Sequence, residues 1–105
     1  MIKVLKFGGT SVGSAANMKK VAEIVRREQA RITVLSAMSG TTDSLVRISR
    51  AAASGDRNAI EEQLAMLTDK YTRCIEELLR ERKQQALARM NATFGLIRDE
   101  AAAFE

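Results

Sequence analysis

The sequence lacks histidine, tryptophan and proline, and it contains a single cysteine, Cys74. Without histidine, the common zinc-ligand sets and histidine-based acid–base catalysis are excluded within the chain. One cysteine cannot make an internal disulfide, which is typical of a cytoplasmic protein in a reducing environment. Because Cys74 lies within a helical pattern, we expect a packed structural thiol and not a nucleophile.

Aromatic residues are also scarce, at 4% of the chain, which leaves almost no platform for stacking single-stranded nucleic acid. The net charge is +4, but basic and acidic residues alternate, as in residues 80–83, which is typical of solvated helix faces. No apolar run reaches the length of a membrane span. We therefore expect neither nucleic acid nor a membrane as a partner.

The 105 residues, 46% of them hydrophobic, are enough for one small globular domain. A chain of this size buries about two-thirds of its unfolded surface on folding. Residues 1–55 carry strand and helix patterns in alternation, whereas residues 56–105 are helical throughout. The predicted fold class is α/β, with a βαβ parallel-strand unit followed by a helical hairpin.

A glycine-rich turn follows the first predicted strand, residues 2–7. The paired glycines at residues 8–9 would let backbone N–H groups approach a phosphate with no Cβ in the way, and Lys6 adds positive charge. A glycine pair alone is more often a structural turn, but its combination with Lys6, Thr10 and Ser11 favours a phosphate site. The lysine precedes the glycines, so the turn is neither a Walker A loop nor a dinucleotide-binding fingerprint.

A helix and a second strand follow this turn. Apolar residues recur at helical spacing from about Ser14 to Gln29, opposite a largely basic face. Residues 32–35 form a short apolar run of the kind buried on both faces of a parallel sheet. Strand, helix and strand within about 35 residues predict one βαβ unit.

Capping signals mark the next two helices. Thr41 or Thr42 is expected to cap a helix that ends near Gly55, where the missing Cβ suits a C-terminal stop. Asn58 with Glu61 resembles a capping box, which predicts the start of the following helix.

Two regular apolar stripes occupy the carboxyl-terminal half, and both are expected to be core. They comprise Ile60, Leu64, Leu67, Tyr71, Cys74 and Leu78, and then Leu87, Met90, Phe94, Ile97, Ala101 and Phe104. Polar residues interrupt the pattern between them, which predicts two antiparallel helices joined near residues 81–86. Because residues 58–93 contain neither glycine nor proline, one long helix is the alternative.

Two motifs resemble those of aspartate kinases, a branch of the amino-acid kinase family. They are KFGGTSV at residues 6–12 and VLSAMSGTTD at residues 34–43, separated by a predicted helix as in that family. The resemblance implies that the ATP phosphates are bound by Lys6, which is also catalytic, Phe7, Gly8 and Gly9. It implies that Thr10 and Ser11 line the reaction crevice and that Ser36 and Thr42 contact aspartate. From the residues alone, the last two would more often be a strand-end and a helix-cap hydroxyl than substrate contacts.

The implied reaction transfers the γ-phosphoryl group of ATP, used with Mg²⁺ as co-substrate, to the side-chain carboxylate of L-aspartate. This step belongs to the biosynthesis of lysine, threonine and methionine. The carboxylate is already ionised at neutral pH, so the site needs no general base and must instead hold two anions together and stabilise the moving charge. No metal ligand is assigned within the chain, and a homo-oligomer is expected.

Aspartate kinases are several times longer than this chain. The resemblance therefore implies the amino-terminal part of a kinase catalytic domain, inactive by itself. Two alternatives come from other classes: a non-catalytic phosphate- or nucleotide-binding module, and a helical interaction protein whose working part is residues 58–104. Glutamate is the alternative substrate within the amino-acid kinases.

Overall fold

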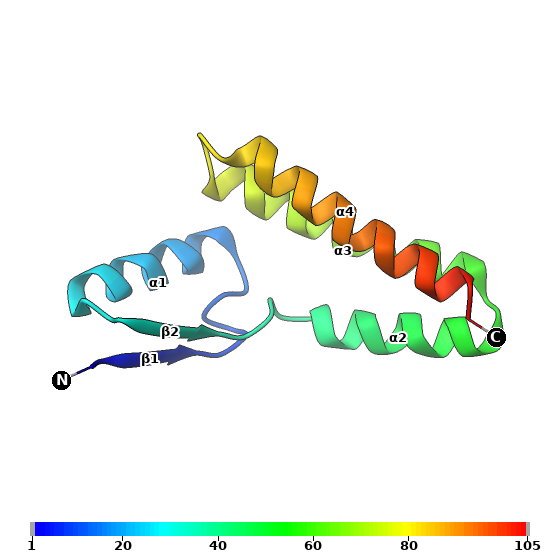
Figure 1. Cartoon of the computed structure of the whole chain (residues 1–105), viewed down its shortest axis with the longest axis horizontal. Coiled ribbons are helices and arrows are strands. Elements are labelled where there is room, and N and C mark those ends of the chain that lie inside the picture. The colour runs from blue at the N-terminus through cyan, green and yellow to red at the C-terminus, as the bar shows by residue number, and fades with distance from the viewer. Residues whose placement is uncertain (1, 105) are drawn as a thin grey trace. The chain divides into compact units, whose positions relative to one another are not determined.

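A computed structural model describes residues 2–104, which form two strands and four helices in the order β1, α1, β2, α2, α3, α4 (Figure 1). The chain divides into two compact units, Met1–Ser39 and Gly40–Glu105. The first unit, here called the βαβ unit, contains the sheet, and the second, the helical unit, contains α2, α3 and α4. The predicted α/β class is confirmed.

The sheet of the βαβ unit consists of two parallel strands. Strand β1, Val4–Phe7, pairs with β2, Ile32–Leu35, in a register that sets Lys6 opposite Val34. Helix α1, Ala15–Glu28, makes the connection between them. The strand–helix–strand prediction is therefore confirmed, and β2 has the predicted bounds.

Helix α1 occupies the predicted range of about Ser14 to Gln29, and these two residues are its caps. Ser14 caps the start, because its Oγ accepts a hydrogen bond of 3.1 Å from the N–H of Asn17. Gln29 ends the helix in the left-handed conformation, at φ 52°, and its N–H bonds to the carbonyl of Arg26.

The prediction that β2 is buried on both faces is wrong for the described residues. Ile32 is 50% exposed, Val34 47% and Leu35 56%. The sheet has two strands in this part of the chain, and α1 is the helix of the βαβ unit that packs on it, along one face (Figure 1). The opposite face of the strands, which carries Ile32 and Val34, is therefore open, although the sequence of β2 is that of an interior strand. Leu35 alternates to the face of α1 and is the last residue of β2.

Helix α2, Thr41–Ser54, starts differently from the prediction. Neither threonine is the cap: the N-cap residue is Gly40, at φ 85°, and the helix start has no side-chain cap hydrogen bond. The hydroxyl of Thr41 is instead 2.7 Å from the hydroxyl of Tyr71, so it is engaged elsewhere. The predicted stop is confirmed, with Gly55 left-handed at φ 73°.

The capping box predicted at Asn58 is also wrong. Helix α3, Arg57–Leu78, is capped by Asp56, whose Oδ1 accepts a hydrogen bond of 3.1 Å from the N–H of Ala59. Asn58 lies inside the first turn. Asp56 is the N-cap residue because aspartate is as good a cap as asparagine and directly follows the left-handed Gly55 that ends α2.

The carboxyl-terminal half is a hairpin and not one long helix. Helix α3 ends at Leu78, Leu79 is extended at φ −110° and ψ 147°, and α4 spans Lys83–Ala102. The junction thus covers residues 79–82, which is earlier than the predicted 81–86. The two helices run side by side and antiparallel (Figure 1), since Tyr71 meets Phe94 and Glu61 meets Arg98.

The core of the helical unit lies where its three helices meet. Its buried residues are Ile48, Ala51, Ile60, Leu64, Leu67, Met90 and Phe94. Tyr71, Leu87, Ile97 and Ala101 pack against this core partly buried, so most of both predicted stripes is confirmed as core. The exception is Phe104, which is 58% exposed because α4 has ended at Ala102 and the helical spacing no longer directs its ring inward.

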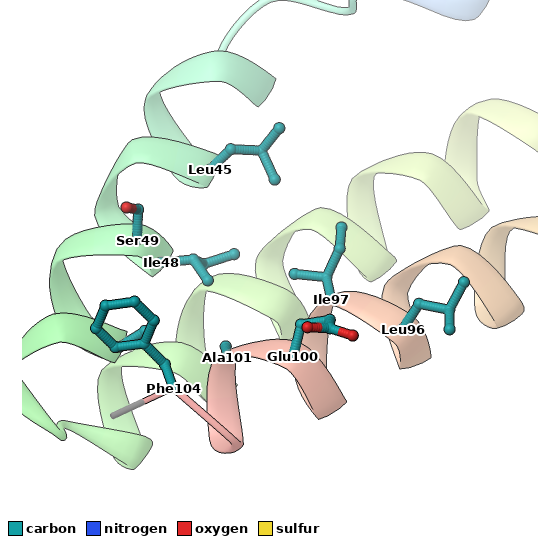
Figure 2. Close-up of a pocket in the computed structure, with 9 residues that line it drawn as sticks. Leu45, Ile48, Ser49, Leu96, Ile97, Glu100, Ala101 and Phe104 are labelled. Carbon is teal, nitrogen blue, oxygen red and sulfur yellow. The ribbon is translucent and has the colours of Figure 1, made fainter.

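An apolar groove of about 410 Å³ runs beside this core, between α2 and the end of α4 (Figure 2). Leu45 and Ile48 border it from α2, and Leu96 and Ile97 from α4. Its polar lining is limited to Ser49 and Glu100, so it offers no constellation of groups for phosphoryl transfer.

Cys74 is buried in the helical unit, as expected for a packed thiol. Burial raises the pKa of its thiol, and the nearby Glu77 carboxylate raises it further. A thiol held in its protonated form is a poor nucleophile. Among the residues that the structure describes, no helix is long and apolar enough to cross a membrane.

Candidate functional site

The candidate site lies at the carboxyl ends of the two strands, where both sequence motifs continue into loops. The strand pairing extends one step further, because the N–H of Ser36 donates a 3.0 Å hydrogen bond to the carbonyl of Phe7. In open parallel sheets, ligands bind at this edge of the strands. The glycine turn and the start of the second loop are therefore adjacent.

Gly9 lies directly against the second loop. A Cβ at this position would be 3.3 Å from the carbonyl oxygen of Ala37 and 3.6 Å from the Oγ of Ser36. The Oγ of Ser39 donates a 3.0 Å hydrogen bond to the carbonyl of Gly9. Close packing between two loops, and not an unusual backbone angle, is thus the reason for glycine here.

Three residues that support this turn were not predicted from the sequence. Besides Ser39, Gly13 folds back on the turn, since a Cβ there would be 3.1 Å from the Oγ of Ser39. The side-chain amide of Asn17 donates a 3.0 Å hydrogen bond to the carbonyl of Thr10. Ser39 stood within the second quoted motif and Gly13 directly follows the first, but their roles depend on contacts between segments far apart in the chain.

Gly8 differs from Gly9, although the two are neighbours. Nothing lies within 4 Å of a Cβ placed on Gly8, and its backbone is not in the left-handed region. Neither packing within the described residues nor strain therefore accounts for a glycine at this position. The space beside it is open to a ligand.

A groove of about 300 Å³ separates the turn from α1. Phe7, Thr10 and Ser11 line it, together with Asn17, Lys20, Val21 and Ile24 of α1. The two hydroxyl residues predicted for the reaction crevice are thus together in one concave surface. Lys20, which belongs to the largely basic face predicted for this helix, also borders this groove.

Lys6 lies on the other face of the sheet. Side chains alternate along a strand. Since Phe7 lines the groove beneath α1, Lys6 is directed to the opposite face, where it is exposed. The structure therefore joins Phe7, Thr10 and Ser11 in one groove, joins Gly9 to Ser36 at the loop contact, and leaves the ammonium of Lys6 apart from that groove.

Thr42 belongs to the helical unit, where it is the second residue of α2 and exposed to solvent. Its neighbour Thr41 is directed inward, only 8% exposed, and meets Tyr71. Lys70 also approaches this helix start, with its Nζ 3.7 Å from where a Cβ on Gly40 would stand. Two successive residues of α3 thus face the start of α2.

Ionisable groups around the turn offer no metal site. Among the described residues, no group of three or more acidic or cysteine side chains could hold a metal ion. The perturbed carboxylate of the βαβ unit is Glu28, whose pKa is lowered mainly by a 2.9 Å hydrogen bond from the ammonium of Lys3. This pair lies at the far end of α1 from the glycine turn and is solvent-exposed.

The whole described chain matches one family of proteins. The model of the amino acid kinase family covers residues 1–104. The chain is 42% identical over 79 residues to aspartokinase 1, chloroplastic, of Arabidopsis thaliana, an alignment covering 71% of the chain and 14% of that protein. It is 39% identical over 75 residues to the aspartokinase of Chlamydia muridarum, covering 71% of the chain and 16% of that protein.

A third relative, the aspartate kinase of Pseudomonas fluorescens, is 40% identical over 68 residues, which cover 61% of the chain and 16% of the relative. The chain thus spans only a small part of the length of these proteins. The family match agrees with the parallel βαβ unit and with the glycine turn at the carboxyl edge of its sheet. On these grounds, the chain belongs to the amino acid kinase family.

Proposed function

We propose that this chain is the amino-terminal part of the catalytic domain of an aspartate kinase, transferring the γ-phosphoryl group of ATP to the side-chain carboxylate of L-aspartate. In support, the three similar proteins described above, one from a plant and two from bacteria, are named aspartokinase or aspartate kinase. The alignments cover 14–16% of those proteins, so the chain by itself would supply only part of a site and be inactive.

The observation that carries the proposal is the contact between the two loops. The hydrogen bond from Ser39 to the carbonyl of Gly9 ties the loop of the second motif to the turn of the first. A phosphoryl transfer that needs no general base depends on positioning and on charge stabilisation. A phosphate-binding turn held against the start of an amino-acid-binding loop meets the first requirement.

The phosphates of ATP would be bound at the glycine turn. The open space beside Gly8 allows backbone N–H groups of Gly8 and Gly9 to donate to phosphate oxygens without hindrance from a side chain. Phe7 would form the floor next to them. Lys6 would supply the catalytic positive charge as a compact ammonium at the end of β1, and it would approach the phosphates from the face of the sheet opposite the groove of Thr10 and Ser11.

The groove lined by Thr10 and Ser11 would be the reaction crevice, and Ser36 and Thr42 would contact aspartate. For Thr42 the exposure of its side chain supports this role, because a hydroxyl that is not a helix cap is open to a ligand. Mg²⁺ would accompany ATP as its counter-ion. Since the described residues contain no acidic cluster for it, no step is assigned to a metal held by this chain.

The same proposal also assigns the protein a pathway, a cellular compartment and an oligomeric state. The product would enter the synthesis of lysine, threonine and methionine in the cytoplasm. The exposed apolar side chains of Val4, Ile32 and Val34 on one face of the sheet support a homo-oligomer or a larger parent domain, since such faces are normally covered.

The decisive experiment measures ATP-dependent formation of aspartyl phosphate, trapped as the hydroxamate, with the full-length protein and with the 105-residue chain. We expect activity in the former and none in the latter. Glutamate in place of aspartate tests the substrate class. A full-length protein that binds ATP but transfers nothing to any amino acid would contradict the proposal and indicate a non-catalytic binding module.

A further inference from the structure

At the start of α2, the helical hairpin contacts the residue next to Thr42, a residue of the proposed site. Thr42 is expected to contact aspartate, yet it lies at a helix end that no side chain caps. The first turn of a helix has backbone N–H groups without intrahelical partners and frays when it is not capped. Something else must hold this turn if Thr42 is to be a precise contact.

The hydroxyls of Thr41 and Tyr71 are 2.7 Å apart and partly buried. Their residues are 30 positions apart in the sequence, on α2 and α3. Thr41 is 8% exposed, and its inward direction sets the rotation of the first turn about the helix axis. Because successive helix residues point about 100° apart, fixing Thr41 also fixes where Thr42 is directed.

Tyr71 is itself held in place. Its ring meets the ring of Phe94 edge-on, with centroids 5.5 Å apart and an interplanar angle of 84°, a favourable aromatic geometry. Phe94 is part of the buried core of the hairpin. A continuous set of contacts therefore runs from the core through Phe94 and Tyr71 to Thr41, which adjoins Thr42.

We propose that Tyr71 is a positioning residue for the amino-acid substrate: through its hydrogen bond to Thr41 it orients the first turn of α2, and with it Thr42. This inference rests on the proposed function, which gives Thr42 its substrate. It assigns a role in aspartate affinity to the helical hairpin, which carries none of the residues of the two motifs.

The first test uses the 105-residue chain and needs no activity. Tyr71→Phe removes the hydroxyl and keeps the ring on Phe94, so we expect faster amide hydrogen exchange at Ser44, whose N–H bonds to the carbonyl of Gly40 in the first turn. The acceleration should be about five- to tenfold, the worth of one hydrogen bond. Asp56, whose N–H bonds to Ala51 at the other end of α2, is the internal reference and should not change.

The second test measures kinetics of the full-length kinase. Tyr71→Phe and Thr41→Val should each raise the KM for aspartate by about five- to tenfold while the KM for ATP stays unchanged. Their combination should be no worse than either alone, because both remove the same bond. Thr41→Ser keeps the hydroxyl and should restore most of the affinity.

A matched control is available on the same helix. Thr72→Val deletes a partly buried hydroxyl next to Tyr71 that contacts the Sδ of Met90, at 3.9 Å, and not α2. It should leave the KM for aspartate unchanged. Thr42→Val, which removes the proposed substrate contact itself, sets the upper limit for the effect of Tyr71→Phe.

Four results would overturn the inference. One is a normal KM for aspartate in Tyr71→Phe together with faster exchange at Ser44, since the bond would then be only structural. The second is an equal rise in the KM for aspartate with Thr72→Val. The third is unchanged exchange at Ser44 in Tyr71→Phe. The fourth is a wild-type parent that does not phosphorylate aspartate, which removes the proposed function as well and is recognised before any variant is made.

Discussion

In the helical unit, apolar side chains from three helices meet in one core, whereas in the βαβ unit most apolar side chains of the strands are exposed. Leu64 is completely buried in the first, while Ile32 and Val34 are 50% and 47% exposed in the second. The residues proposed for phosphoryl transfer are concentrated in the less buried unit. The proposed chemistry and the most closely packed core therefore belong to different parts of this chain.

This division has a physical basis. A binding edge of a sheet must stay open, so its loops can be held only by a few hydrogen bonds, such as that from Ser39 to Gly9. Packed helices have no such restriction and can bury apolar residues at every turn. The hairpin can thus serve as a rigid support for the start of α2, which carries Thr42.

The largest expected effect tests the difference in burial. Leu64→Ala should lower the free energy of unfolding by about 2–5 kcal/mol, because it leaves a cavity in a closed core. Val34→Ala in β2 should cost no more than about 1 kcal/mol, since that side chain is already half exposed. Urea unfolding of the chain measures both.

Leu96→Ala is the matched control, with the same atoms deleted from a leucine that is 65% exposed. We expect a change within about 0.5 kcal/mol. A loss from Val34→Ala as large as that from Leu64→Ala would contradict the comparison and would mean that the exposed face of the sheet is covered in solution.

The next effect concerns chemistry in the βαβ unit. In the full-length kinase, Lys6→Ala should lower kcat by about 10²–10³, equivalent to about 3–4 kcal/mol, with little change in ATP affinity. Lys6→Arg should rescue poorly, because a planar guanidinium cannot replace a point charge beside a tight turn. Steady-state kinetics will measure both variants. The control is Lys19→Ala, which removes an exposed lysine of α1. Near-normal turnover in Lys6→Ala would mean that Lys6 is structural.

The two neighbouring glycines sharpen the comparison within one turn. Gly9→Ala should lower stability by about 1–3 kcal/mol, because its Cβ would press on the backbone carbonyl of Ala37 at 3.3 Å. Gly8→Ala meets nothing within 4 Å and should leave the melting temperature unchanged while weakening ATP binding in the full-length kinase. If Gly8→Ala binds ATP normally, the open space beside this residue is not the phosphate site.

The smallest effect is electrostatic and lies away from the site. The pKa of Glu28 should be below its ordinary value of 4.5, because Lys3 donates a hydrogen bond to the charged carboxylate. A lowered pKa in the folded state means that this pair stabilises the fold above pH 4.5 and that the contribution is lost as pH falls through the lowered value. In Lys3→Met, the pKa of Glu28 measured by NMR titration should rise to about its ordinary value. An unchanged pKa would show that the pair does not persist in solution.

Much of the fold could be predicted because its signals are local. Apolar spacing predicted α1 and the hairpin, and the glycines at 8–9 and 55 marked the ends of a strand and a helix. The errors were of two kinds. Several capping residues compete at each helix start, as with Asp56 and Asn58, and an apolar strand such as β2 has the composition of an interior strand whether or not it is covered.

The sequence by itself determined the order of strands and helices, the family motifs and the placement of both motifs after parallel strands, because each depends on residues close together in the chain. Only the tertiary structure decided which glycine is packed and which is open, that Ser39 ties the two loops, and that Thr41 faces inward while Thr42 does not. The physical reason is that the contacting residues are far apart in the sequence. Both the bond from Ser39 to Gly9 and that between Thr41 and Tyr71 join residues 30 positions apart, and no local periodicity encodes such contacts.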